Sequence, residues 1–203
     1  MSNTVTTEAE LDEIYGQPVA VAITKELDHI SAHYRAFIEK SPFVVIASSG
    51  PEGLDCTPRG DPAGFVRVLD PNTVLIPDRR GNNRIDTLRN IVRDPRISLL
   101  FLIPGISQTL RINGRAEIRT DLELRESFTM QNKVPATVIA ITAERVYTQC
   151  PKALVRAKLW DAGTQIPRSA LPSSGEILQA LDADFDGPAY DAGYDTHMKK
   201  TIY

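Results

Sequence analysis

The residues best suited to bind a charged ligand lie between Asp78 and Arg96. This stretch holds six arginines and three aspartates, within a chain whose net charge is -3. At its front, Gly81 lets the backbone approach a ligand closely. Asn82 and Asn83 are typical helix caps, and Arg84 follows in the first turn of a predicted helix. Because a helix N-terminus offers unpaired N–H groups and partial positive charge, this spacing predicts a phosphate site.

The later arginines of the stretch have a simpler interpretation. Arg89, Arg93 and Arg96 fit solvated charges on a helix face, where most charged residues lie. Arg84 is different, because a cation near a helix start is unfavourable unless an anion accompanies it. We therefore favour a functional role for Arg84.

Two further clusters could hold an anion. Lys152 and Arg156 are four residues apart on a predicted helix and share one face. They form either an anion site or a solvated basic face. Arg59 and Asp61 lie in a stretch where proline and glycine interrupt strand pairing, so they either bind a substrate or pair with each other.

The histidines and cysteines predict no metal site. His29 and His33 have i,i+4 spacing, but no third ligand accompanies them. Cys56 and Cys150 match no zinc motif and fit ordinary thiols.

The elements that position these residues are mostly strands. β-branched runs separated by Gly and Pro turns predict two hairpins, over 43–61 and 65–76. Longer strands are expected at 97–103, 109–119 and 136–150, with Gly114 at a bulge or bend. Helices are expected over 7–15, from Thr24 to before Pro42, and over 83–94, 121–130 and 152–160. Six or seven antiparallel strands favour a closed or nearly closed barrel.

Composition limits the class of protein. With 203 residues, 42% hydrophobic and 24% charged, the chain fits one soluble globular domain plus extensions. Its small negative charge gives no general attraction for nucleic acid or anionic membrane. Apolar runs are far shorter than the roughly 20 residues of a membrane span. Since no signal peptide is evident, we expect a cytoplasmic protein.

Several segments together resemble one known family. They are Pro77-Asp-Arg-Arg-Gly-Asn-Asn-Arg84, Ser98-Leu-Leu-Phe101 and Thr109-Leu-Arg-Ile-Asn-Gly-Arg-Ala-Glu117. From about Phe43 to Trp160 the chain is similar to the pyridoxamine 5'-phosphate oxidase-like, FMN-binding split-barrel family. The resemblance implies an α+β, mainly β fold: a six-stranded antiparallel split barrel with peripheral helices. It also implies a homodimer with FMN at the subunit interface.

The resemblance assigns cofactor-binding roles residue by residue. The backbone at Pro77 and Asp78 would meet the flavin, and the phosphate clamp falls on Asn82, Asn83 and Arg84. The strand under the isoalloxazine and the later strand that approaches the ring contribute Phe65, Val66, Arg67 and Thr109. The segment with Lys152 and Arg156 resembles a C-terminal motif of one branch, where both could face the FMN or substrate of the partner subunit. The Arg-x-His pattern that holds substrate phosphate in the oxidases themselves is missing, so oxidation of pyridoxamine phosphate is not predicted.

These observations predict three parts and one function. Residues 1–42 form an N-terminal helical extension, 43–160 the barrel, and 161–203 an extension able to wrap the partner. We expect an FMN-dependent oxidoreductase that takes electrons or hydride from a donor such as reduced nicotinamide and passes them to a small molecule. The alternatives are a non-catalytic FMN storage or sensing protein and a small nucleic-acid-binding barrel. The last is disfavoured because Asp78–Arg96 contains no aromatic residue for base stacking. The residues do not distinguish FMN from haem or a deazaflavin.

Overall fold

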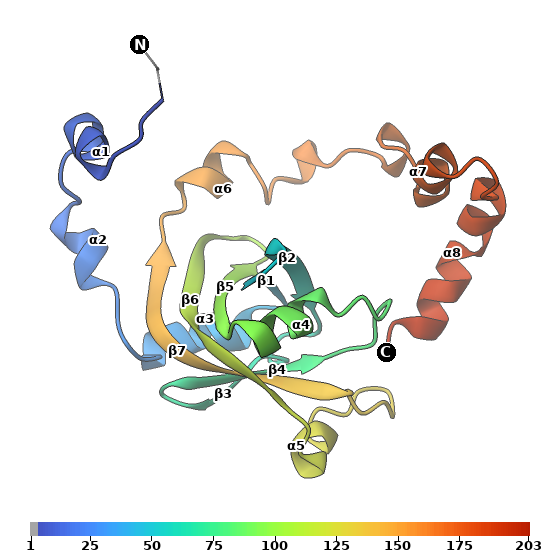
Figure 1. Ribbon diagram of the computed structural model, residues 1–203, viewed down its shortest axis with the longest axis horizontal. Coiled ribbons are helices and arrows are strands. Elements are labelled where there is room, and N and C mark those ends of the chain that lie inside the picture. Colours follow the sequence, from blue (N-terminus) through green and yellow to red (C-terminus); the bar gives the residue numbers. More distant parts are fainter. Residues whose placement is uncertain (1–3) are drawn as a thin grey trace.

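The computed structural model describes residues 4–203 and is built around one antiparallel sheet (Figure 1). Seven strands pair in the order β2-β1-β5-β6-β7-β4-β3. Their bounds are β1 Phe43–Gly50, β2 Gly53–Gly60, β3 Arg67–Asp70, β4 Thr73–Asp78, β5 Arg96–Ile103, β6 Ile106–Arg119 and β7 Thr137–Gln149.

The sheet curls around the long pair β6 and β7. Between Asn113 and Gly114 the register of this pair shifts. A Cβ atom on Gly114 would lie 2.0 Å from the backbone oxygen of Thr142, so only glycine fits this approach. The predicted bulge at Gly114 is confirmed. Figure 1 shows the long strands β6 and β7 running side by side through the curved sheet.

The hydrophobic core fills the inside of the curl. Burial alternates along β1, with Val44 and Ile46 fully buried, as period-2 side-chain orientation requires. Ile112 and Ile141 continue the same core from β6 and β7. Among the helices that pack on this sheet are α3 (Ala32–Lys40) and α4 (Asp86–Arg93). The core therefore fixes the strand ends and the loop before α4, which line the site described below.

The N-terminal helices differ from the prediction. α1 (Glu8–Tyr15) begins with a capping box at Thr7, as expected. The single helix expected from Thr24 is wrong: α2 covers only Ala20–Thr24 and α3 begins at Ala32. Leu27 lies between them and exchanges two backbone hydrogen bonds with Val146, of 3.0 and 2.7 Å. This β-bridge with β7 replaces the helical hydrogen bonds.

The C-terminal arm, residues 161–203, arches away from the sheet and returns to it at its end (Figure 1). Before it, α6 covers only Lys152–Arg156, not the predicted 152–160, and Trp160 donates a hydrogen bond from Nε1 to the Ile106 carbonyl at 2.9 Å. Likewise, α5 is shorter than predicted and covers Leu122–Glu126. Within the arm, α7 (Ser174–Leu181) and α8 (Gly187–Thr201) pack on each other.

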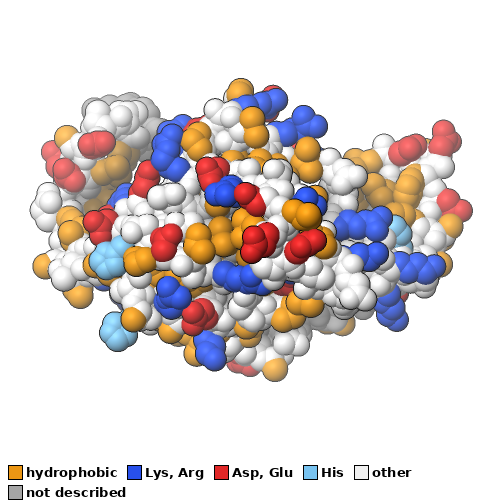
Figure 2. Space-filling view, turned by 90° about the horizontal axis from the view of Figure 1, so that it is seen from below, with side chains coloured by type: hydrophobic (Ala, Val, Ile, Leu, Met, Phe, Trp, Pro, Cys, Tyr) orange, Lys and Arg blue, Asp and Glu red, His pale blue; other side chains and the backbone are white. Residues whose placement is uncertain are grey.

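An α+β fold with an antiparallel sheet and peripheral helices is therefore confirmed. The residue pattern predicted six or seven strands and the resemblance implied six; seven are observed. Because β2 and β3 do not pair with each other, a closed barrel is not confirmed. The division at residues 43 and 161 stays a prediction. Across residues 4–203, no helix combines the length and hydrophobicity needed to cross a membrane. The surface seen in Figure 2 mixes positive and negative side chains, in keeping with the small net charge.

Candidate functional site

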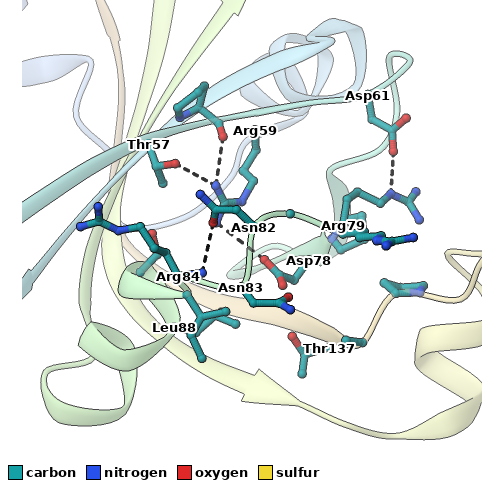
Figure 3. A pocket seen from close by; sticks show the side chains of 18 of the residues that line it. Thr57, Arg59, Asp61, Asp78, Arg79, Asn82, Asn83, Arg84, Leu88 and Thr137 are labelled. Carbon is teal, nitrogen blue, oxygen red and sulfur yellow. Dashed lines mark hydrogen bonds and ion pairs between the residues drawn. The ribbon is translucent and has the colours of Figure 1, made fainter. Parts of the chain in front are cut away.

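A cavity of about 1200 Å³ opens where β2, the end of β4 and the start of β7 meet (Figure 3). The loop 79–85 and α4 form one wall, and residues 133–136 form another. Ile202 and Tyr203, which follow α8, also line it. The cavity is large enough for a cofactor-sized ligand.

The cavity is more positive than the chain as a whole. Six cationic side chains line it against four carboxylates, which leaves a net charge of +2 in a chain of -3. The cations are Arg59, Arg79, Arg80, Arg84, Arg125 and Lys133, and the carboxylates are Asp55, Asp61, Asp78 and Asp86. A local positive field of this kind favours an anionic ligand.

One corner of the cavity is built around Asp61, whose side chain is fully buried. Its Oδ2 accepts a hydrogen bond from Arg79 Nε at 2.8 Å, and its Oδ1 accepts one from the Tyr203 hydroxyl at 2.5 Å. Arg79 also donates to the Phe128 carbonyl at 2.7 Å, and its guanidinium lies 5.6 Å from the centre of the Tyr203 ring. The hydrogen bond to Asp61 raises the pKa of Tyr203, because it favours the protonated hydroxyl.

A second pair lies on the floor of the cavity. Arg59 reaches Asp78 at 3.6 Å and is held by Thr57 Oγ1 at 2.9 Å and the Pro58 carbonyl at 3.0 Å. Burial raises the pKa of Asp78, and the nearby Arg59 charge lowers it in part. Its neighbour in register on β7 is Thr137. The Thr137 hydroxyl is buried and has no hydrogen-bond partner among the described residues. Because buried polar groups are nearly always hydrogen-bonded, an ordered water or a ligand atom would satisfy this oxygen.

The loop before α4 corrects the predicted phosphate geometry. The helix begins at Asp86 rather than near Asn83, and its cap is Ile85, which makes no side-chain capping bond. Asn83 and Ile85 have φ angles of 63° and 51°, so the backbone turns left-handed there and delays the helix. The side-chain oxygen of Asn82 does not cap the helix, and it accepts a hydrogen bond from the Arg84 backbone amide at 3.1 Å.

Arg84 is consequently not in the first helical turn. Its side chain is 79% exposed, and its Nε lies 2.7 Å from Asp86 Oδ2. A phosphate near Arg84 would meet a loop rather than a helix N-terminus. It would also compete with the carboxylate of Asp86.

Most of the residues predicted for the site do come together. Those that line the cavity are Arg59, Asp61, Phe65, Pro77, Asp78, Gly81, Asn82, Asn83 and Arg84. Phe65 and Val66 precede β3 and both belong to the core, but Phe65 also lines the cavity, whereas Val66 is fully buried and does not.

The remaining predicted residues do not line this cavity. Arg67 turns to Ser127, whose Oγ it binds at 2.9 Å, and its guanidinium lies 3.8 Å from the centre of the Phe128 ring. Thr109 is buried in β6. Lys152 and Arg156 lie on α6, which packs on β6 away from the cavity lining.

Among the cavity residues that sequence reasoning missed, four stand out. Arg125 and Lys133 flank a turn that no motif marks, and Thr137 reads as an ordinary strand residue. Tyr203 lies 142 residues from its partner Asp61, so no local pattern could connect the two.

Comparison with known proteins gives a family match. The family model described as pyridoxamine 5'-phosphate oxidase matches residues 30–150. Among solved structures, HupZ of Group A Streptococcus has 21% identity and a TM-score of 0.49, over 59% of this chain and 93% of that chain. A putative pyridoxamine 5'-phosphate oxidase of Lactobacillus delbrueckii has 19% identity and a TM-score of 0.48, over 61% and 98%. An F420 reductase has 16% identity and a TM-score of 0.40, over 60% and 97%. No curated protein gives a significant match.

Proposed function

The chain belongs to the pyridoxamine 5'-phosphate oxidase family, a family of flavin-binding oxidoreductases, and on that premise we propose that its cavity binds FMN. The observation that carries the proposal is the orphaned Thr137 hydroxyl in a cavity of net charge +2. FMN would supply two things that the cavity lacks: polar ring atoms near a buried hydroxyl, and a phosphate that balances the excess of positive charge.

The lining residues divide between the two ends of such a ligand. Arg80, Arg84 and Lys133 are exposed cations that would hold the phosphate. The backbone at Pro77 and Asp78 and the side chain of Thr137 would meet the ring. Phe65 supplies an apolar surface at the cavity wall. When bound, FMN supplies one- and two-electron redox chemistry, and the protein supplies position, charge and exclusion of water.

The activity we propose is electron transfer between a donor such as reduced nicotinamide and a small-molecule acceptor. We also propose a homodimer, in which a second copy covers the open side of the cavity. Two features support it: the cavity is open to solvent, and β2, one of its walls, is a sheet edge with free backbone groups. Lys152 and Arg156 lie outside this cavity, which leaves them free to face a partner subunit.

The test is the visible spectrum and FMN affinity of the purified protein, measured with Thr137→Val as a matched variant. Valine keeps the shape of threonine and suits a strand, so it removes only the hydroxyl. We expect the unliganded variant to be as stable as wild type or more so, because a buried unsatisfied hydroxyl is unfavourable. We expect its FMN affinity to fall about fivefold or more, the loss of one hydrogen bond. A protein that binds no FMN, or a variant with unchanged affinity and lower stability, would contradict the proposal.

The second candidate, an FMN-binding protein without turnover, is favoured by one observation. Every carboxylate of the cavity already has a partner: Asp61, Asp78 and Asp86 pair with arginines, and Asp55 accepts a hydrogen bond from Thr87 at 2.6 Å. None of them is free to move a proton. Anaerobic addition of reduced nicotinamide separates the two candidates, because only an oxidoreductase bleaches bound FMN faster than free FMN is bleached.

A further inference from the structure

Tyr203 occupies one corner of the cavity as a ligand would. The Arg79 guanidinium lies 5.6 Å from the centre of the Tyr203 ring, and the Tyr203 hydroxyl donates a hydrogen bond to Asp61 at 2.5 Å. Both partners are shielded from solvent: the Asp61 side chain is fully buried and that of Arg79 is 16% exposed. The corner therefore recognises two features, an aromatic face for the cation and a hydrogen-bond donor for the carboxylate.

The element that carries Tyr203 is only loosely attached to the sheet. α7 and α8 approach each other at Gly175 and Gly187, where a Cβ atom on either would clash with the other's backbone oxygen. Asp191 of α8 reinforces this by accepting a hydrogen bond from the Gly175 amide at 2.8 Å. Neither helix packs broadly on a strand, and the arm stands away from the sheet before it returns (Figure 1). Withdrawing its end would leave the core untouched.

Withdrawal of Tyr203 would leave a specific chemical deficit. Asp61 Oδ1 would lose its only protein donor and would be left to water, while Arg79 would still satisfy Oδ2. An apolar group could fill the space but could not donate a hydrogen bond to this oxygen. A carboxylate oxygen that is buried without a partner is unfavourable.

We propose that the corner formed by Asp61 and Arg79 is a binding subsite for an aromatic molecule that carries an O–H or N–H donor, and that Tyr203 occupies it until such a molecule takes its place. The subsite stands on the protein without cofactor. Its role as the substrate position of an oxidoreductase rests on the proposed function, since the same cavity would hold the flavin.

Phenol is the probe, because it reproduces the Tyr203 side chain without the backbone. Binding is measured by calorimetry or NMR titration on wild type, Tyr203→Ala and Tyr203→Phe, all free of flavin. We expect Tyr203→Ala to bind phenol at least tenfold more tightly than wild type. Tyr203→Phe keeps the ring but loses the donor to Asp61, so it should bind phenol more tightly than wild type and less tightly than Tyr203→Ala. Toluene, which lacks the donor, should gain no comparable affinity for Tyr203→Ala.

Two results of the phenol and toluene titrations would overturn the subsite. Equal phenol affinity in wild type and Tyr203→Ala, with both folded by thermal melting, overturns the subsite. So does an equal gain for toluene, since the corner would then be only an apolar gap. FMN titration of the same variants is independent: a protein that takes up phenol but no FMN refutes the proposed function and leaves the subsite standing, and the reverse result refutes the subsite alone.

Discussion

Removal of the Arg79 charge is the sharpest test of how the cavity wall is stabilised. In Arg79→Met, the fully buried Asp61 carboxylate loses its cationic partner, and the Phe128 carbonyl loses a donor at 2.7 Å. Breaking a buried ion pair by removing one partner costs about 3–5 kcal/mol, because an uncompensated charge stays buried. We expect a loss of that size in the free energy of unfolding, measured by urea denaturation at neutral pH with an unchanged m value.

The structure offers a matched control on the other side of the cavity. Arg84 pairs with Asp86 at a similar distance, 2.7 Å, but its side chain is 79% exposed. Arg84→Met should therefore cost at most about 1 kcal/mol. The double variant Arg79→Met with Asp61→Leu should lose less than the sum of the single variants, because no charge is left unpaired. If Arg79→Met costs no more than Arg84→Met, the burial argument is refuted.

Three further changes test separate parts of the molecule. Burial raises the pKa of Asp78, so the folded state disfavours its charged carboxylate. The resulting loss of folding stability is absent below the ordinary pKa of 3.8 and grows as pH rises through the folded pKa. Asp78→Asn should accordingly raise stability at pH 7 by up to about 1 kcal/mol and not at pH 3, as thermal melts at the two pH values would show. Gly114→Ala places a Cβ atom 2.0 Å from the Thr142 oxygen and should cost about 3 kcal/mol in urea unfolding; a cost below 1 kcal/mol would mean the bend relaxes freely. Arg84→Ala should weaken FMN binding roughly ten- to a hundredfold by fluorescence titration, and unchanged affinity would move the phosphate elsewhere.

Local sequence patterns were sufficient to predict most strands. The β-branched run after Phe43 and the Gly50-Pro-Glu-Gly53 turn specify a hairpin within a few residues, and β1 and β2 follow it closely. The number of strands and the closure of the sheet depend on pairings far apart in the chain, such as β4 with β7. No local pattern encodes those pairings.

Tertiary contacts also explain the helix errors. The apolar spacing after Thr24 fits a helix, but Leu27 gains two backbone hydrogen bonds from Val146 and leaves the helix. In the loop before α4, Asn83 was expected to cap the helix, but it has a positive φ, which asparagine tolerates, and the cap is Ile85. No pattern pointed to Ile85, because a β-branched residue rarely adopts positive φ, and with its φ of 51° the helix starts at Asp86.

The candidate site was predictable in its basic loop and unpredictable in its assembly. An arginine-rich stretch with Gly81 near its front predicts ligand binding in one segment of sequence. The hydrogen bond from Tyr203 to Asp61 joins residues that are 142 positions apart in the chain, and it depends on the path of the whole C-terminal arm. The orphaned Thr137 hydroxyl is likewise visible only in three dimensions, because nothing in a strand sequence shows which hydroxyl lacks a partner.

The pairing inside the cavity indicates how much charge its ligand carries. Three arginines of the lining each pair with an aspartate. Of the other charged residues, Arg80, Arg125 and Lys133 are positive and only Asp55 is negative, so the lining keeps a charge of +2. A phosphate monoester carries about -1.5 to -2 at pH 7 and would neutralise that excess. We therefore expect FMN to bind at least tenfold more tightly than riboflavin, which has the same ring and no phosphate. The difference should shrink as salt rises from 0.05 to 0.5 M, roughly a threefold shorter Debye length, because two of the cations that carry it, Arg80 and Lys133, are exposed. Equal affinity for the two flavins at low salt would show that the positive lining serves the fold rather than the ligand.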